Sequence, residues 1–531
     1  MGKKFVAYTV VLTTLVLSLV SFGCRETAQE KQQPEDIHAA LNRIESHLSW
    51  VDYRLGQETW REYAHGWSDS LDFFRALRAS VLDDKMLTAP DATVQAQLTD
   101  EQERRRYQLL RRQAASAGLD QGENVKPLRD SLDEFFSHPW CDLGDAVVTP
   151  EEAAYVMTTD RRRSEREAAY RAMTSPGQLT AEQIARLFRV RNQVARRHGY
   201  NDYLSYLSSL YDWDTPAYQV LLGRLDSLTA GPYRRLLEEL RAGFRDESFD
   251  IWDWDNRFAN TLSEADEYFP VDSQLNMARR SFAAMGFNLD KMPIYIDLIP
   301  ADDGRADVRT VAVRVPGDIR VVTRLTPGIP SLRRLLQGLG EAVHLASIGQ
   351  ESELLARGSA PVWRDGIELF FSRLPMQPEW LKEYGHVPSE LVDRYVRASD
   401  AVDLLQLRLL LVDARFELEA YRNPDRDFNE LYWNLYAEHA GFPQHQDLTP
   451  WAAQPEYIAA PLDSRDRLLA RMVAAQTRAY LVDRFGTTVD SPEIGSFLVY
   501  SFFRFGGRYD WLEMFERATD RDLSPTVLVS R

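Results

Sequence analysis

The sequence predicts a mainly α-helical protein that contains one small antiparallel β-sheet. Apolar residues recur at three- and four-residue steps along most of the chain, which is the pattern of amphipathic helices. One interval, residues 293–325, instead contains three β-rich runs. The chain has 531 residues and only two cysteines, so a large hydrophobic core rather than disulfides must stabilise it.

The N-terminus reads MGKKFVAYTVVLTTLVLSLVSFGC, in which two lysines precede an apolar run from Phe5 to Val20. This order is typical of a secretory signal. The small residues before Cys24 resemble the lipobox of bacterial lipoproteins, in which the cysteine is lipidated and becomes the mature N-terminus. We therefore predict a signal peptide over residues 1–23, lipidation at Cys24, and export to a bacterial membrane, facing the periplasm or the surface. A transmembrane anchor is the alternative, but the run is short for a span of about 20 residues.

The rest of the chain divides into a tether and one large domain. Residues 24–36 are polar and lack periodicity, which indicates a flexible tether. Residues 37–531 are predicted to form a single helical domain, with Thr149 and Thr180 as N-caps of two of its helices. Besides a first helix around residues 41–55, the spacing predicts helices over residues 99–117, 150–173, 179–197, 215–245, 273–285, 330–348, 390–421, 427–439 and 465–485.

The β-rich interval consists of PIYIDLI, TVAVRV and IRVVTRL, and Pro316, Gly317 and Asp318 form a turn between the last two runs. A short antiparallel sheet therefore precedes the helix over residues 330–348.

Composition excludes one class of partner. Lys and Arg number 63 against 80 Asp and Glu, so the net charge of −17 argues against nucleic acid and against a basic membrane-binding face. The second cysteine, Cys141, stands among apolar and aromatic residues and is predicted to be a buried thiol.

The stretch GLGEAVHLASIGQ, residues 338–350, contains part of a zinc-binding pattern. A zinc peptidase helix reads His-Glu-x-x-His, which places two imidazoles on one helical face with a glutamate as general base. Here Glu341 and His344 are in place, but Gly340 stands where the first histidine should be. A further carboxylate, Glu368, follows 24 residues after His344 in the apolar helical context RDGIELFFS.

These features resemble the gluzincin zinc metallopeptidases, the group of angiotensin-converting enzyme, oligopeptidase F and thimet oligopeptidase. GDIRVVTRL (317–325) is similar to the strand before the zinc helix, and RNQVARRHGYNDYLSYLSS (191–209) and LYWNLYAEHAGF (431–442) resemble two further segments of the group. The resemblance implies a two-lobed helical metallopeptidase shell around a deep channel, with the zinc and an edge strand on the channel floor.

Residue by residue, the resemblance places the general base on Glu341, the second zinc ligand on His344 and the third on Glu368. Gly340 offers no ligand. Because catalytic zinc needs three protein ligands besides water, we interpret His344 and Glu368 as a partial, vestigial site and Glu341 as a vestigial base. If this is correct, Gly340→His should restore zinc binding.

The same resemblance implies a substrate-binding edge strand, in which pairing uses the backbone and needs no particular side chain. The histidine and two tyrosines with which the family holds substrate and stabilises the oxyanion fall on Tyr457, Ser464 and Arg467, and none of the three matches. The candidate substrate-binding residues are Arg309, Thr310, Val311, Ala312, Val313 and Tyr457.

The sequence thus predicts a degenerate, catalytically inactive member of this group: a lipoprotein that binds a peptide or an extended protein segment and needs no cofactor. Two alternatives are an active zinc-dependent peptidase that recruits an unrecognised ligand, and a helical scaffold without a ligand site.

Overall fold

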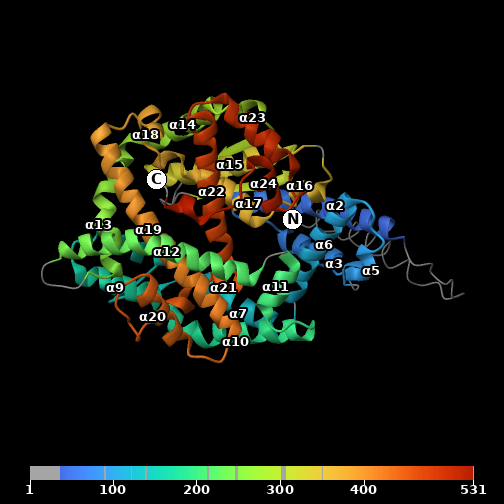
Figure 1. Cartoon of the computed structure of the whole chain (residues 1–531), viewed down its shortest axis with the longest axis horizontal. Coiled ribbons are helices and arrows are strands. Elements are labelled where there is room, and N and C mark those ends of the chain that lie inside the picture. Colours follow the sequence, from blue (N-terminus) through green and yellow to red (C-terminus); the bar gives the residue numbers. More distant parts are fainter. Residues whose placement is uncertain are drawn as a thin grey trace, which may run out of the picture.

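The computed structural model describes residues 36–529, except residues 89–90, 121, 123, 138–139, 212–213, 245–248, 301–306 and 350. The predicted signal peptide, Cys24 and nearly all of the tether lie outside the described residues. The prediction of a mainly helical fold is confirmed, because the structure is 72% helix and 6% strand (Figure 1).

The helices of the first half of the chain begin with a long helix, α2, that packs against α3. Their bounds are α2 Ile37–His65, α3 Leu71–Leu82, α4 Lys85–Thr88, α5 Asp91–Gln95, α6 Glu101–Asp120, α7 Lys126–Ser137, α8 Pro150–Thr159, α9 Arg163–Thr174, α10 Pro176–Arg197, α11 Tyr203–Tyr211, α12 Thr215–Ala242 and α13 Ile251–Ser263.

The second half contains the helix of the zinc-like pattern, α15, and the helix that carries Glu368, α17. The bounds are α14 Val271–Ala284, α15 Ile329–Ala346, α16 Glu353–Arg357, α17 Pro361–Ser372, α18 Pro378–Glu383, α19 Ser389–Arg422, α20 Phe428–His439, α21 Glu456–Ala459, α22 Asp463–Phe485, α23 Pro492–Ser501 and α24 Trp511–Thr519. None of these described helices combines the length and the apolar composition needed to span a bilayer.

The two predicted N-caps have different outcomes. Thr149 caps α8 as predicted: its hydroxyl accepts from the backbone N–H of Glu152, whose carboxylate accepts in return from the N–H of Thr149. The prediction for Thr180 is wrong, because Pro176 begins α10 four residues earlier. Inside the helix, the Thr180 hydroxyl donates to the carbonyl of Ala452.

The sheet contains three strands in the order β3 (Ile294–Leu298), β5 (Asp318–Arg324), β4 (Asp307–Arg314). The β4–β5 pair is antiparallel and joined by the predicted turn. However, β3 pairs with β5 in parallel, so the sheet is mixed rather than antiparallel throughout. The direction of β3 could not be read from the β-rich runs alone.

A second, two-stranded sheet was not predicted. Its strands are β1 (Cys141–Leu143) and β2 (Ala146–Val148), and they form an antiparallel hairpin. Cys141 on β1 is buried and unpaired, which confirms the prediction of a buried thiol.

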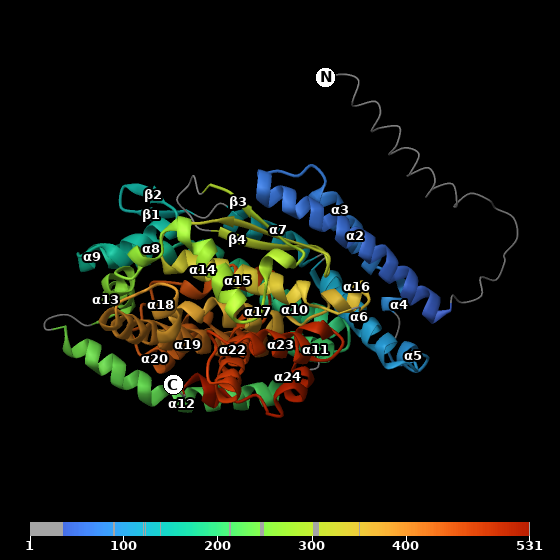
Figure 2. The same ribbon diagram turned by 90° about the horizontal axis from the view of Figure 1, so that it is seen from above.

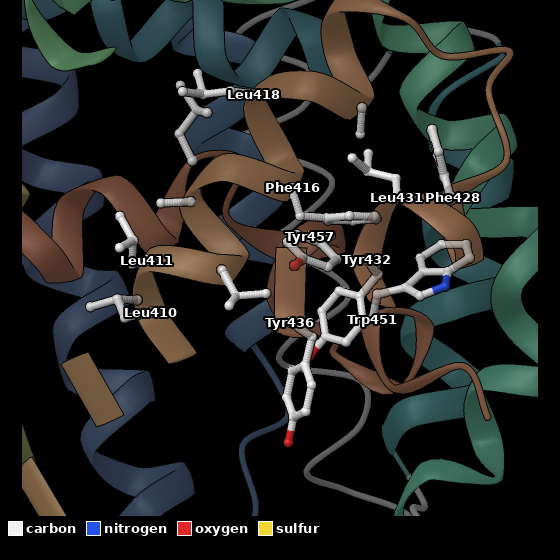
Figure 3. Close-up of a cluster of buried hydrophobic side chains, with 14 of the residues drawn as sticks. Leu410, Leu411, Phe416, Leu418, Phe428, Leu431, Tyr432, Tyr436, Trp451 and Tyr457 are labelled. Carbon is white, nitrogen blue, oxygen red and sulfur yellow. The ribbon is translucent and has the colours of Figure 1, made fainter. Parts of the chain in front are cut away.

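Two large hydrophobic clusters form the core. The first gathers around α10, α12 and α20, and Figure 3 shows part of it, with the aromatic rings of Phe416, Tyr432 and Tyr457. The second gathers around α14, α15, α17 and the sheet. Helices α19 and α22 contribute residues to both clusters, and Figure 1 shows both helices running between the upper and lower parts of the molecule. The channel implied by the resemblance stays a prediction.

Candidate functional site

Helix α15 carries Glu341 and His344, and its two glycines let it pack unusually closely against its neighbours. A Cβ added at Gly338 would lie 2.5 Å from Val308 of β4, and one added at Gly340 would lie 2.4 Å from the ring of Phe371 on α17. Real Cβ atoms do not approach so closely. The glycines therefore mark close contacts of α15 with the sheet and with α17.

The position of Gly340 is incompatible with a histidine ligand. The Phe371 ring that faces it is fully buried and stacks on Phe282, with 4.9 Å between the ring centroids. A histidine side chain at position 340 would have to displace this ring from the core. The prediction that Gly340→His restores a zinc site stays a prediction, but the buried Phe371 ring that fills the space beside Gly340 opposes it.

His344 lies in an apolar environment. Its side chain is buried, its ring centroid lies 5.0 Å from that of Phe503, and neither ring nitrogen has a hydrogen-bond partner among the described residues. Burial, with a smaller contribution from the positive charge of Arg364, lowers the pKa of His344 to about 3. The imidazole is therefore neutral at every physiological pH.

Glu341 and Glu368 are brought together by the packing of α15 on α17. Burial and then the negative charge of Glu368 raise the pKa of Glu341 to about 8, against the opposing effects of Arg364 and of a hydrogen bond with Thr310. Burial also raises the pKa of Glu368, although its carboxylate accepts a 2.9 Å hydrogen bond from Gln337 Nε2. The two carboxyl groups therefore share one partly desolvated region.

Arg364 provides the positive charge of this region, and the sequence interpretation missed it. Its Nε atom lies 3.6 Å from Glu368 Oε1 and 3.5 Å from Asp365 Oδ1, and its charge also acts on Glu341. Arg364 stands one helical turn before Glu368 on α17, and this i, i+4 spacing was the available signal. We call Glu341, Arg364 and Glu368 the carboxylate–guanidinium cluster.

The residues present do not fit a zinc ion. Phe371 fills the space at Gly340, Phe503 packs on the His344 ring, and a guanidinium already lies among the carboxylates. Within the part of the chain that the structure describes, no three His, Cys, Asp or Glu side chains are grouped so that they could hold a metal ion. No step of chemistry is therefore assigned to a metal here.

A pocket of about 720 Å³ lies beside the candidate edge strand. Strand β4 stands at one edge of the sheet, and α2 crosses it so closely that a Cβ on Gly56 would lie 2.9 Å from the carbonyl oxygen of Ala312. Residues from α2, α3, α6, β4 and the α16–α17 connection line the pocket (Figure 2 shows α2 and α3 next to the sheet). Its walls thus come from segments that are more than 300 residues apart in sequence.

The predicted substrate-binding strand is only partly in this pocket. Thr310, Val311 and Ala312 line it, whereas Arg309 and Val313 do not. The side chain of Arg309 is more than half exposed and that of Val313 is fully buried.

Arg357 occupies part of the outer edge of β4. Its Nη1 donates to the carbonyl of Ala312 at 2.9 Å and its Nη2 to that of Val313 at 3.0 Å, while Glu353 holds its Nε at 2.7 Å. The register shift after Ala312 turns two successive carbonyls toward the same guanidinium. A peptide pairing with β4 would therefore use the part of the strand before Ala312.

Thr310 connects the pocket to the cluster. Its hydroxyl donates to the carbonyl of Gly338 at 2.8 Å and is also hydrogen-bonded with Glu341. Since Thr310 lines the pocket as well, the carboxyl group of Glu341 lies directly behind the pocket wall.

The other aligned positions are not brought to this place. Tyr457 is buried in the first hydrophobic cluster, where its ring lies 5.8 Å from that of Phe416 (Figure 3). Ser464 donates to Glu417, and Arg467 pairs with Asp463 at 3.6 Å. None of the three lines the pocket.

No protein-family model matches this chain, and no curated protein matches it.

Proposed function

We propose that this protein is a gluzincin-like pseudo-peptidase that binds an extended peptide or protein segment and does not hydrolyse it with zinc. The observation that carries the proposal is the pocket along the edge strand β4. Its lining residue Thr310 lies next to Glu341 of the carboxylate–guanidinium cluster.

The pocket suits a peptide in size and in shape. Ligand sites generally occupy about 300–1,000 Å³, and the volume beside β4 falls in this range. An exposed sheet edge can pair with an extended backbone, with neighbouring pockets for alternate side chains. The mixture of apolar residues such as Leu48 and Leu109 with charged ones such as Asp52 suits an extended chain better than a uniformly apolar ligand.

The cluster argues against hydrolysis. A general base must be ionised, whereas burial and the negative charge of Glu368 raise the pKa of Glu341 and so favour its protonated form. In a zinc peptidase the metal would also acidify the attacking water, and the residues around Gly340 and His344 do not fit such an ion. We therefore propose that the site retains a binding surface without the catalytic chemistry.

The order of elements supports the proposed relationship. Strand β5, helix α15 and helix α17 occur in this order in the sequence. Helix α15 packs against the sheet on one side and against α17 on another. The resemblance implies this arrangement for the strand, the zinc helix and the helix of the third ligand. We further propose that Cys24 carries lipid and anchors the exported protein to a bacterial membrane.

A pocket-filling variant tests the binding proposal. Ser49 on α2 lines the pocket, so Ser49→Trp should fill it and weaken the binding of peptides selected from a random dodecapeptide library at least tenfold. Ser227→Trp is the matched control, because Ser227 is an exposed serine in the middle of α12 and does not line the pocket. Fluorescence anisotropy of labelled peptides on the full chain in detergent measures both.

The same preparation tests for catalysis. The protein is incubated with the peptide library with and without a chelator, and the products are analysed by mass spectrometry. We expect no peptide cleavage that the chelator reduces. Chelator-sensitive cleavage that Glu341→Gln abolishes would show instead that the protein is an active zinc peptidase. Equal peptide affinity of Ser49→Trp and the unmodified chain would refute binding in this pocket.

A further inference from the structure

Exposed aromatic side chains gather on the hairpin of α2 and α3. Trp50 on α2 and Phe73 on α3 are 54% and 59% exposed, and both contact Phe74, with ring centroids 6.0 and 5.2 Å apart. Trp67, in the turn between the two helices, is 61% exposed. We call Trp50 and Phe73, together with the buried Phe74 that both contact, the aromatic patch.

The charges next to the aromatic patch are balanced. The Arg54 guanidinium lies 5.2 Å from the centroid of the Phe74 ring and 3.9 Å from Glu58, and Arg75 pairs with Asp72 at 3.0 Å. The patch is therefore apolar and locally neutral on a chain of net charge −17. Such a surface does not attract a polyanion, but it matches the interface of a bilayer, where aromatic side chains are enriched.

The N-terminus can bring the patch to a membrane. From Cys24 to the first residue of α2, Ile37, the chain can extend about 40 Å. Trp50 lies 13 residues into α2, which is about 20 Å along the helix axis. A lipid on Cys24 therefore leaves enough chain for α2 to lie along the bilayer surface.

We infer that the aromatic patch lies in the interface of a phospholipid bilayer and orients the protein on it. This inference rests on the proposed lipid anchor at Cys24. Helix α2 also lines the pocket through Ser49, Asp52 and Gly56, so a bound patch holds the pocket within one helix diameter of the membrane. Peptide segments close to the membrane surface would then be the natural ligands.

The test places a fluorophore at the patch in the full chain. Phe73→Cys is labelled with NBD and reconstituted into phosphatidylcholine vesicles, with the unsubstituted chain treated alike to measure labelling of the buried Cys141. We expect NBD emission to shift to shorter wavelength and to be quenched by doxyl-labelled lipid. Both effects should persist at high salt, because the contact of the patch with the bilayer is apolar. The control is Tyr500→Cys on α23, a helix separate from α2 and α3 (Figure 2). Tyr500 is 65% exposed and should show neither effect.

Three results would overturn the inference. Water-like emission at position 73 in chains that float with the vesicles would show that the patch stays in solvent although the anchor works. A shift without quenching by doxyl lipid would show that protein, either a second copy or the N-terminal segment, covers the patch. Failure of the chain to float with the vesicles would refute the lipid anchor, and the reach argument with it, while leaving peptide binding in the pocket to its own test.

Discussion

Carboxyl groups that are wholly or partly buried are handled in two different ways in this protein. Glu341 and Glu368 are partly buried and lie beside the positively charged guanidinium of Arg364. Glu417, on α19, is instead satisfied by neutral donors: the N–H of Leu462 at 2.6 Å and the hydroxyl of Ser464 at 2.9 Å. Burial still raises the pKa of Glu417 to about 7.

Glu417 predicts a pH dependence of stability. Its folded pKa of about 7 lies above its ordinary value of 4.5, so between these values the folded state holds a proton that the unfolded state has lost. This stabilising contribution is complete below about pH 4.5 and is lost as the pH rises toward 7. Glu417→Gln keeps an acceptor for Leu462 and a donor for Ser464 but does not titrate, so it should gain stability relative to the unmodified chain as the pH rises.

The gain in unfolding free energy of Glu417→Gln over the unmodified chain should reach up to about 3 kcal/mol by pH 8, since each unit of pKa is worth about 1.4 kcal/mol. Urea unfolding of both chains at several pH values between 4 and 8 measures it. If the two chains keep a constant difference in unfolding free energy over that range, Glu417 does not hold a proton in the folded state.

At the scale of elements, the glycines of α15 determine how three elements meet. Because Gly338 has no Cβ, the side chain of Val308 on β4 can lie directly against it, and Phe371 of α17 lies in the same way against Gly340. Glycine in a helix interior costs about 1 kcal/mol relative to alanine, and here the closer packing on the buried face of α15 offsets that cost. The contact of Gly340 with Phe371 also leaves no room for a larger side chain at position 340.

Gly340→Ala tests this packing. The added Cβ would meet the Phe371 ring at 2.4 Å, so we expect destabilisation by about 1–3 kcal/mol despite the better helix propensity. Gly223→Ala in α12 is the matched control, because nothing lies within 4 Å of its added Cβ. That variant should gain about 0.5–1 kcal/mol. Thermal unfolding should therefore shift in opposite directions, and a stabilised Gly340→Ala would contradict the close contact of α15 with α17.

At the scale of the whole molecule, the pocket depends on the N-terminal helices as much as on the sheet. Residues of α2, α3 and α6 line it together with the sheet edge, α16 and the α16–α17 connection. Because α2 directly follows the predicted tether, the proposed membrane attachment and the proposed ligand binding involve the same helix. The proposed anchor therefore bears on the position of the pocket as well as on localisation.

The anchor itself is tested by Cys24→Ala. Radiolabelled palmitate should enter the unmodified chain in a bacterial host and should not enter the variant, because the variant lacks the thiol that accepts the lipid. The variant should accumulate as a precursor or be released from the membrane fraction. Equal labelling of both chains would remove the lipoprotein proposal.

The sequence by itself determined the features that local patterns encode. Helical periodicity located α6, α12, α15, α19 and α22, and the turn residues after Val315 located the β4–β5 hairpin, because hydrogen bonding and side-chain direction within one element repeat at a fixed spacing. The apolar and aromatic residues next to Cys141 in the sequence also predicted that its thiol is buried. The incomplete His-Glu-x-x-His pattern and the spacing of 24 residues from His344 to Glu368 also singled out two carboxylates, Glu341 and Glu368, that lie close together in the fold.

Only the tertiary structure decided what stands between and around those residues. No spacing in the sequence reveals that Phe371 fills the space next to Gly340, that Arg364 lies among the carboxylates, or that Tyr457 belongs to the other hydrophobic cluster. The direction of β3 and the pocket between α2 and β4 were equally hidden. These contacts join segments that are distant in sequence, and the complementary shapes that select them exist only when the whole core has packed.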